Sequence, residues 1–69
     1  MNGVAVVVNG ESRVVPPSTT VLVLMKDLGA VRDGVAVAVN DELVLRSRWE
    51  DTKLRDRDQV EVLSAAPGG

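Results

Sequence analysis

The sequence of 69 residues contains no cysteine and no histidine. Without cysteine the chain has no thiol nucleophile, no disulfide and no thiolate ligand for zinc or an iron–sulfur cluster. Without histidine it lacks the most common general base, and a Ser-His-Asp triad is excluded. A domain of this length also has a small core, which packing alone must stabilise. We therefore expect a protein that is not an enzyme and binds no metal or cofactor of its own.

The chain also has few aromatic residues and no excess of positive charge. Trp49 is the one aromatic residue, and 8 basic side chains stand against 10 acidic ones, for a net charge of −2. Nucleic-acid binding requires an excess of Lys and Arg against the phosphates, and single-strand binding also uses aromatic stacking platforms. The composition therefore argues against a nucleic-acid partner.

Long hydrophobic runs are missing too. The apolar runs are short, as at Val4–Val8 and Val35–Val39, whereas a membrane-spanning helix needs roughly 20 apolar residues. No basic region precedes the first run, as a signal peptide requires. The sequence thus predicts a soluble, cytoplasmic protein with no membrane association.

What the chain does contain is β-branched residues in alternating patterns, punctuated by turn residues. Asn9-Gly10 favours the positive φ angles of a type I′ hairpin turn, and Asn40-Asp41 favours a second turn. Pro16-Pro17 ends the first hairpin because proline cannot donate to a strand ladder. The predicted strands are 4–8, 11–15, 35–39, 42–45 and 59–63.

A helix is predicted between the two hairpins, over Val21–Leu28. The hydroxyls of Ser18, Thr19 and Thr20 can cap its first turn, and Gly29 can end it. The run Val21–Met25 could also form a strand, but the capping signals favour the helix. The residues at helical spacing, which we expect in the core, are Val21, Leu24, Met25 and Leu28.

The charged segment 46–58 is predicted to be a loop or short helical turn, pinned by Trp49 and Leu54. We expect Trp49 to cover one end of the core. The interleaved charges predict a solvated surface rather than a metal loop, because positive side chains separate the carboxylates; docking of an acidic partner is the weaker alternative. The charged residues are Glu50, Asp51, Lys53, Arg55, Asp56, Arg57 and Asp58, with Arg46 and Arg48 preceding them.

The order of elements predicts an α+β fold of the β-grasp type. The helix would cross one face of a mixed sheet of about five strands, with the first and last strands parallel in its middle. Residues 1–63 would form this domain, and residues 64–69 a flexible tail. The strand residues expected to face the helix are Val4, Val6, Val8, Val35, Val37, Val39, Val60 and Val62.

The tail ends in Gly68-Gly69, after Ala66 and Pro67. Because glycine has no Cβ, such a backbone can thread a channel too narrow for other residues and bring a terminal carboxylate to a partner's nucleotide. The alternative is an inert end with an accidental glycine pair. With no catalytic side chains in the chain, the carboxylate is the group best placed to react.

These features together resemble the ThiS-like sulfur carrier proteins, which share the ubiquitin-like β-grasp fold with the MoaD small subunit of molybdopterin synthase. The resemblance covers nearly the whole chain. Its most specific part is the Arg46-Ser47-Arg48-Trp49 segment combined with the terminal Gly68-Gly69. The other matching segments are 8–11, 20–21, 24–25, 28, 37–40, 44, 54, 58 and 60–62.

Three positions depart from the family's usual pattern. Leu45 stands where proline is common, and Arg57-Asp58 stands where Gly-Asp is common. Pro67 precedes the glycines, where small or β-branched residues are common; it fixes φ and removes an N–H from the tail, although an extended tail tolerates polyproline-like angles.

The resemblance implies a carrier whose Gly69 carboxylate is the modified group. A ThiF-like adenylyltransferase would use ATP to make the acyl-adenylate, and a persulfide donor would convert it to a thiocarboxylate. A ThiG-like thiazole synthase would then accept the sulfur for the thiazole ring of thiamine. The residues that would thread the partner's active site are Ala66, Pro67 and Gly68.

Strand alternation also predicts a docking face on the side of the sheet away from the helix. An apolar face beside the tail would suit a partner surface, although scattered surface hydrophobic residues are ordinary. The residues expected on it are Val7, Ala36, Ala38, Glu61 and Leu63.

Three other functions remain open on the sequence. The first is a sister carrier serving molybdopterin, cysteine or tRNA thiolation. The second is a protein modifier conjugated to lysine through Gly69. The third is an interaction module with an inert tail.

Overall fold

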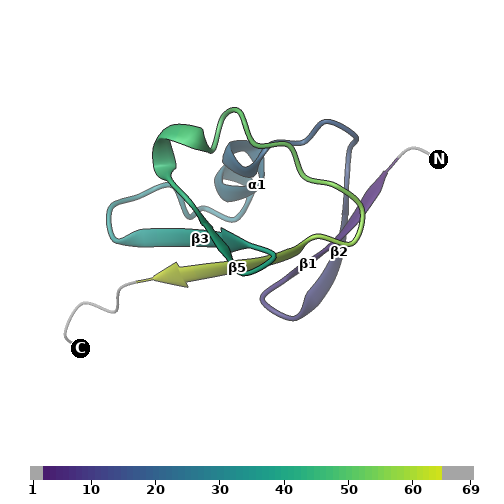
Figure 1. Ribbon diagram of the computed structural model, residues 1–69, viewed down its shortest axis with the longest axis horizontal. Coiled ribbons are helices and arrows are strands. Elements are labelled where there is room, and N and C mark those ends of the chain that lie inside the picture. Colours follow the sequence, from purple (N-terminus) through teal and green to yellow (C-terminus); the bar gives the residue numbers. More distant parts are fainter. Residues whose placement is uncertain (1–2, 65–69) are drawn as a thin grey trace.

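The structure, a computed structural model, describes residues 3–64. Figure 1 shows one helix lying over one face of a twisted sheet. The strands are β1 (Val4–Val8), β2 (Glu11–Val15), β3 (Val35–Val39), β4 (Glu42–Val44) and β5 (Gln59–Ser64), the helix is α1 (Val21–Asp27), and a 3₁₀ turn, η1, spans Arg46–Arg48.

The sheet is five-stranded, with the order β2-β1-β5-β3-β4. β1 and β5 run parallel in its middle, while β2 pairs with β1, and β3 with both β4 and β5, in the antiparallel sense. This arrangement confirms the predicted α+β β-grasp fold. β5 runs through Ser64, one residue beyond the predicted strand, and the predicted tail residues Ala66, Pro67, Gly68 and Gly69 lie outside the described residues.

Both hairpins turn through asparagine with positive φ. In the β1–β2 turn, φ is 49° at Asn9 and 85° at Gly10; in the β3–β4 turn, it is 53° at Asn40 and 69° at Asp41. Two successive residues with positive φ define the type I′ turn, whose twist matches that of the flanking strands. The turn residues in the sequence therefore located both hairpins correctly.

α1 begins where the threonines predicted it. The Thr20 hydroxyl accepts a hydrogen bond from the Val23 N–H at 3.2 Å, which satisfies one of the free donors of the first turn. Val21, Leu24 and Met25 are fully buried. The strand alternative for this segment is therefore wrong.

The prediction that Leu28 belongs to the core is also wrong. α1 ends at Asp27, and Leu28 is its C-cap residue, with 37% of its surface exposed. The chain turns away at Gly29, where φ is 67°, and the Ala30 N–H then donates to the Met25 carbonyl at 2.9 Å. Ala30 is buried instead, because the helix is too short to carry the i+7 position over the sheet.

The core lies between α1 and the inner face of the sheet. Trp49 is 1% exposed and donates its indole N–H to the Val44 carbonyl at 2.9 Å, so the polar atom of this large buried side chain has a partner. The predicted helix-facing valines are all buried or packed against the core. The core residues are Val6, Val8, Val15, Val21, Leu24, Met25, Ala30, Val37, Trp49, Leu54 and Val60, with Val4, Val35, Val39, Val44 and Val62 packed against them.

β4 is shorter than predicted. It ends at Val44, and Leu45 instead precedes η1 with extended backbone angles. Leu45 is 62% exposed. The chain leaves the sheet there because η1 and Trp49 must turn back over the core.

Candidate docking face and tail-bearing strand

The face of the sheet opposite α1 carries the residues predicted for docking. Leu63 lies directly opposite Ala36, and Glu61 lies opposite Ala38, on the paired strands β5 and β3. Val7 is on the same face of β1, opposite Gln59. Leu63 is 57% exposed, and Glu61 is exposed beside it. The structure therefore brings the five predicted residues onto one surface, which we call the open face.

Two further apolar residues extend the open face and were missed from the sequence. Leu43 lies opposite Ala38 on β4 and is 64% exposed, while Val14 lies opposite Ala5 on β2 and is 75% exposed. Both belong to edge strands, whose facing was not assigned from the sequence. The alternation of Leu43 with the core-packed Val44 was the signal that could have found the first of them.

β5 carries the open-face residues Glu61 and Leu63 and leads into the predicted tail. Its last residue, Ser64, pairs with Val35 at the start of β3. In Figure 1 this end of the sheet lies on the same side of the molecule as the loop before β3 and η1. The reactive carboxylate predicted at Gly69 thus follows a strand held in the centre of the sheet.

A network of short hydrogen bonds fixes the segment that enters β5. The Asp58 carboxylate accepts from the Asn40 side-chain amide at 2.9 Å and from the Arg55 N–H at 2.8 Å, and the Asp56 carboxylate accepts from the Ala5 N–H at 2.9 Å. Asp58 is 8% exposed. The prediction of a solvated acidic surface is therefore wrong for Asp58, because its carboxylate closes the turn before β5.

The basic residues of segment 46–58 do not form one patch. The Arg46 guanidinium lies 4.9 Å from the centroid of the Trp49 ring and donates to the Arg32 carbonyl at 2.6 Å. Arg57 is directed to solvent, with 92% of its side chain exposed. Arg46 thus stabilises the Trp49 end of the core, and docking of an acidic partner by the other basic residues stays a prediction.

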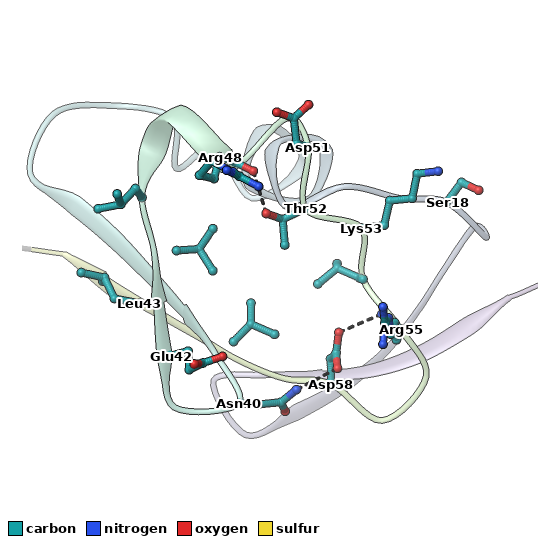
Figure 2. Close-up of a pocket in the computed structure, with 14 residues that line it drawn as sticks. Ser18, Asn40, Glu42, Leu43, Arg48, Asp51, Thr52, Lys53, Arg55 and Asp58 are labelled. Carbon is teal, nitrogen blue, oxygen red and sulfur yellow. Dashed lines mark hydrogen bonds between the residues drawn. The ribbon is translucent and has the colours of Figure 1, made fainter.

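Arg48 and Arg55 instead line a groove of about 930 Å³ between β4 and segment 51–55. Figure 2 shows basic and acidic side chains together around it, with Arg48 and Lys53 on the loop side and Glu42 on β4. Asp58, at one end, is already engaged by Asn40 and Arg55. Over residues 3–64 no three His, Cys, Asp or Glu side chains converge as a metal site.

No helix among the described residues is long and apolar enough to cross a membrane.

Comparison with known proteins decides the family. The family model of the ThiS family matches residues 2–69. The chain belongs to the ThiS family. The sulfur carrier protein ThiS of Thermus thermophilus is 41% identical over 61 residues, which cover 88% of this chain and 94% of that protein.

A solved structure extends the match to the fold. The crystal structure of the thiamine biosynthesis protein ThiS from Geobacter metallireducens has a TM-score of 0.79 and 31% sequence identity, and the match covers 94% of this chain and 99% of that one. The ubiquitin-like β-grasp fold is thereby confirmed. The comparisons also confirm the function expected from the resemblance, that of a sulfur carrier of thiamine biosynthesis.

A third relative is much longer than this chain. The thiazole synthase of Paramagnetospirillum magneticum is 36% identical over 63 residues, which cover 91% of this chain but only 19% of that protein. A ThiS-like segment therefore forms a small part of a larger protein named for thiazole synthesis.

Proposed function

We propose that this ThiS-family carrier transfers sulfur through the carboxylate of Gly69 and is a co-substrate rather than an enzyme. A carboxylate oxygen attacks the α-phosphorus of ATP in the site of a ThiF-like adenylyltransferase, which forms the acyl-adenylate and releases pyrophosphate. A persulfide sulfur then displaces AMP, and a thiol cleaves the acyl disulfide to leave the thiocarboxylate. ATP is bound by the activating partner, and this chain holds no cofactor of its own.

The placement of β5 is the observation that carries this proposal. The strand lies between two neighbours in the centre of the sheet, its exposed side contributes Leu63 to the open face, and residues 65–69 follow directly. A partner that covers the open face would therefore hold the base of the tail beside its own active site. The tail residues Ala66, Pro67 and Gly68 would pass through the partner's channel.

A ThiG-like thiazole synthase is the proposed acceptor of the sulfur. Support comes from the Paramagnetospirillum protein, which is named thiazole synthase and contains a segment similar to this carrier. When a carrier and its acceptor are joined in one chain, the effective concentration of one at the other is raised without any new contact. When the carrier and the thiazole synthase are separate chains, the carrier must dock on the synthase, and the exposed apolar residues of the open face suit such a contact.

Intact-mass measurement tests the chemistry. The protein is incubated with the adenylyltransferase, ATP and a persulfide donor, and a mass gain equal to the difference between sulfur and oxygen is expected on the fragment containing Gly69. The chain lacking Gly68-Gly69 is the control and must show no gain. Adducts to lysine would instead identify a protein modifier, and an unchanged mass would refute sulfur carriage through Gly69.

Substitution on the open face tests the docking surface. Leu63→Asp places a charge where an apolar contact is expected, so it should reduce kcat/KM for adenylation at least tenfold, equivalent to about 1.4 kcal/mol, while the melting temperature stays close to that of the parent. Leu45→Asp is the matched control, because Leu45 is similarly exposed, at 62%, but lies beyond β4. Equal kinetics for the two variants would refute docking through the open face.

A further inference from the structure

The ladder between β1 and β5 ends well before β5 does. The paired residues are Val7 with Gln59 and Val8 with Val60, after which β1 turns away into the hairpin at Asn9. On its other side, β5 is paired with β3 from Val60 through Ser64. The half of β5 nearest the tail therefore has a strand partner on one side only.

Asn9 continues the ladder where β1 stops. Its N–H donates to the Val60 carbonyl at 2.9 Å. Its side-chain oxygen accepts from the Val62 N–H at 2.8 Å, and its side-chain N–H donates to the Val62 carbonyl at 3.5 Å. An asparagine amide offers one acceptor and two donors, so it can replace a peptide unit of a neighbouring strand.

This use of Asn9 depends on its backbone conformation. Its φ of 49° is one that asparagine adopts more readily than most residues with a side chain. The turn and the contact to β5 thus require the same residue type. Glycine would satisfy the turn but could not reach Val62.

We propose that Asn9 is a positioning residue for the tail, a role that rests on the proposed adenylation of Gly69. By holding Val62 on the side that β1 leaves open, it supports the pairing of β5 with β3, which runs as far as Ser64. Ser64, the last residue of β5, then stays in the sheet five positions before Gly69. Without Asn9 the residues from Glu61 to Ser64 are held by the β3 ladder alone, so this half of β5 opens more often and the free length of chain then extends toward Val60.

The size of the effect follows from the length of chain. Each residue spans at most about 3.3–3.6 Å, and effective concentration falls with roughly the −3/2 power of the length of the connecting segment. When residues 61–64 also separate from β3, the segment that connects the sheet to Gly69 nearly doubles, which lowers the effective concentration in that opened state about two- to threefold. Because β3 still pairs with this half of β5, the opened state is partly populated, and we expect kcat/KM for adenylation to fall about twofold.

The β3–β4 turn supplies a matched control. Asn40 has nearly the same φ, 53°, and its side-chain oxygen accepts from the Gln59 N–H at 3.0 Å. It thus makes a similar contact with β5, but at the start of the strand, far along the chain from the tail, and its side-chain N–H also donates to the Asp58 carboxylate at 2.9 Å. Asn40→Gly reports what the loss of an asparagine from such a turn does to the fold in general.

The experiment compares Asn9→Gly, Asn9→Asp and Asn40→Gly with the parent chain. Adenylation kinetics with the adenylyltransferase give kcat and KM, and hydrogen exchange gives the protection of the Val62 amide. Each variant is also made without Gly68-Gly69, and the binding of this shortened chain, the body, to the adenylyltransferase gives its affinity. Circular dichroism and thermal melting establish that each variant is folded.

For Asn9→Gly we expect faster exchange at Val62, an about twofold lower kcat/KM expressed mainly in kcat, and unchanged affinity of the body. Asn9→Asp keeps the acceptor for the Val62 N–H and should restore most of the activity. Asn40→Gly should leave the kinetics and the protection of Val62 unchanged.

The proposal is overturned if Asn9→Gly retains parental kinetics, if Asn40→Gly shows the same loss, or if the loss is explained by weaker binding of the body. Failure of the parent chain to be adenylated at all would instead refute the proposed function, and the role of Asn9 with it.

Discussion

Replacing Arg57 with glycine should stabilise this protein. Arg57 occupies the turn before β5 with φ of 73°, and its N–H donates to the Ala5 carbonyl at 2.6 Å, so the turn cannot relax to a negative φ without losing that bond. A left-handed backbone costs a residue with a Cβ about 1–2 kcal/mol. The Arg57 side chain contributes little stability, because its ion pair with Asp56, at 3.9 Å, is largely exposed and such pairs contribute about 0–1 kcal/mol.

The expected gain is smaller than the strain that is removed. Glycine also widens the unfolded ensemble, at a cost of about 0.4–1 kcal/mol. We therefore expect Arg57→Gly to raise the free energy of unfolding by about 0.5–1 kcal/mol. In a domain of this size that corresponds to an increase of several degrees in melting temperature, on the scale of about 4–8 °C per kcal/mol.

Urea denaturation measures this change, with Arg57→Ala as the control. Alanine removes the same charge and ion pair but keeps the Cβ, so it should leave the stability near that of the parent. A stabilised alanine variant would show that the charge, not the backbone, was unfavourable. An unchanged or less stable glycine variant would refute the strain argument, provided that the denaturant dependence of the unfolding free energy is unaltered.

The remaining stability predictions concern the helix and the turn before β5. Leu24→Ala should lower the free energy of unfolding by about 2–5 kcal/mol because Leu24 is fully buried. Leu28→Ala, at the exposed C-cap, should lower it by less than about 1 kcal/mol. Equal losses by chemical denaturation would contradict the assignment of Leu28 to the surface. Asp58→Ala should cost about 1–3 kcal/mol because it leaves donors on its neighbours without an acceptor, while Asp51→Ala, at an exposed position, should stay within about 0.5 kcal/mol of the parent. A neutral Asp58→Ala in the same measurement would show that these hydrogen bonds do not stabilise the turn.

Local sequence signals were sufficient for most of the fold. The Asn9-Gly10 and Asn40-Asp41 turns follow from the residues that tolerate positive φ, and the strand faces follow from alternation with period two. The start of α1 follows from Thr20, whose hydroxyl is the observed cap. Each of these signals acts between residues that are near in sequence, which is why they can be recognised without a structure.

The errors occurred where the packing of the folded domain decided which side chain is buried. The spacing of Leu28 fits a longer helix, but the structure ends α1 at Asp27 and buries Ala30 instead. Asp58 belongs to a charged segment, yet it is buried because Asn40 and Arg55 converge on its carboxylate. Gly29 signalled the end of the helix, but the burial of Ala30 in place of Leu28 and the approach of Asn40 to Asp58 depend on how these segments pack in the folded domain.

The sequence by itself determined the order of strands and helix, the two asparagine turns, the family, and the absence of thiol and imidazole chemistry from the chain. These depend on residue types and on short-range backbone preferences. Only the tertiary structure decided that Asn9 holds Val62, 53 positions along the chain, that Leu43 and Val14 extend the open face, and that Arg57 carries backbone strain. Those features arise when the sheet brings the first and last strands side by side, because an amide, a carboxylate or a free N–H is satisfied by whichever group the fold places beside it.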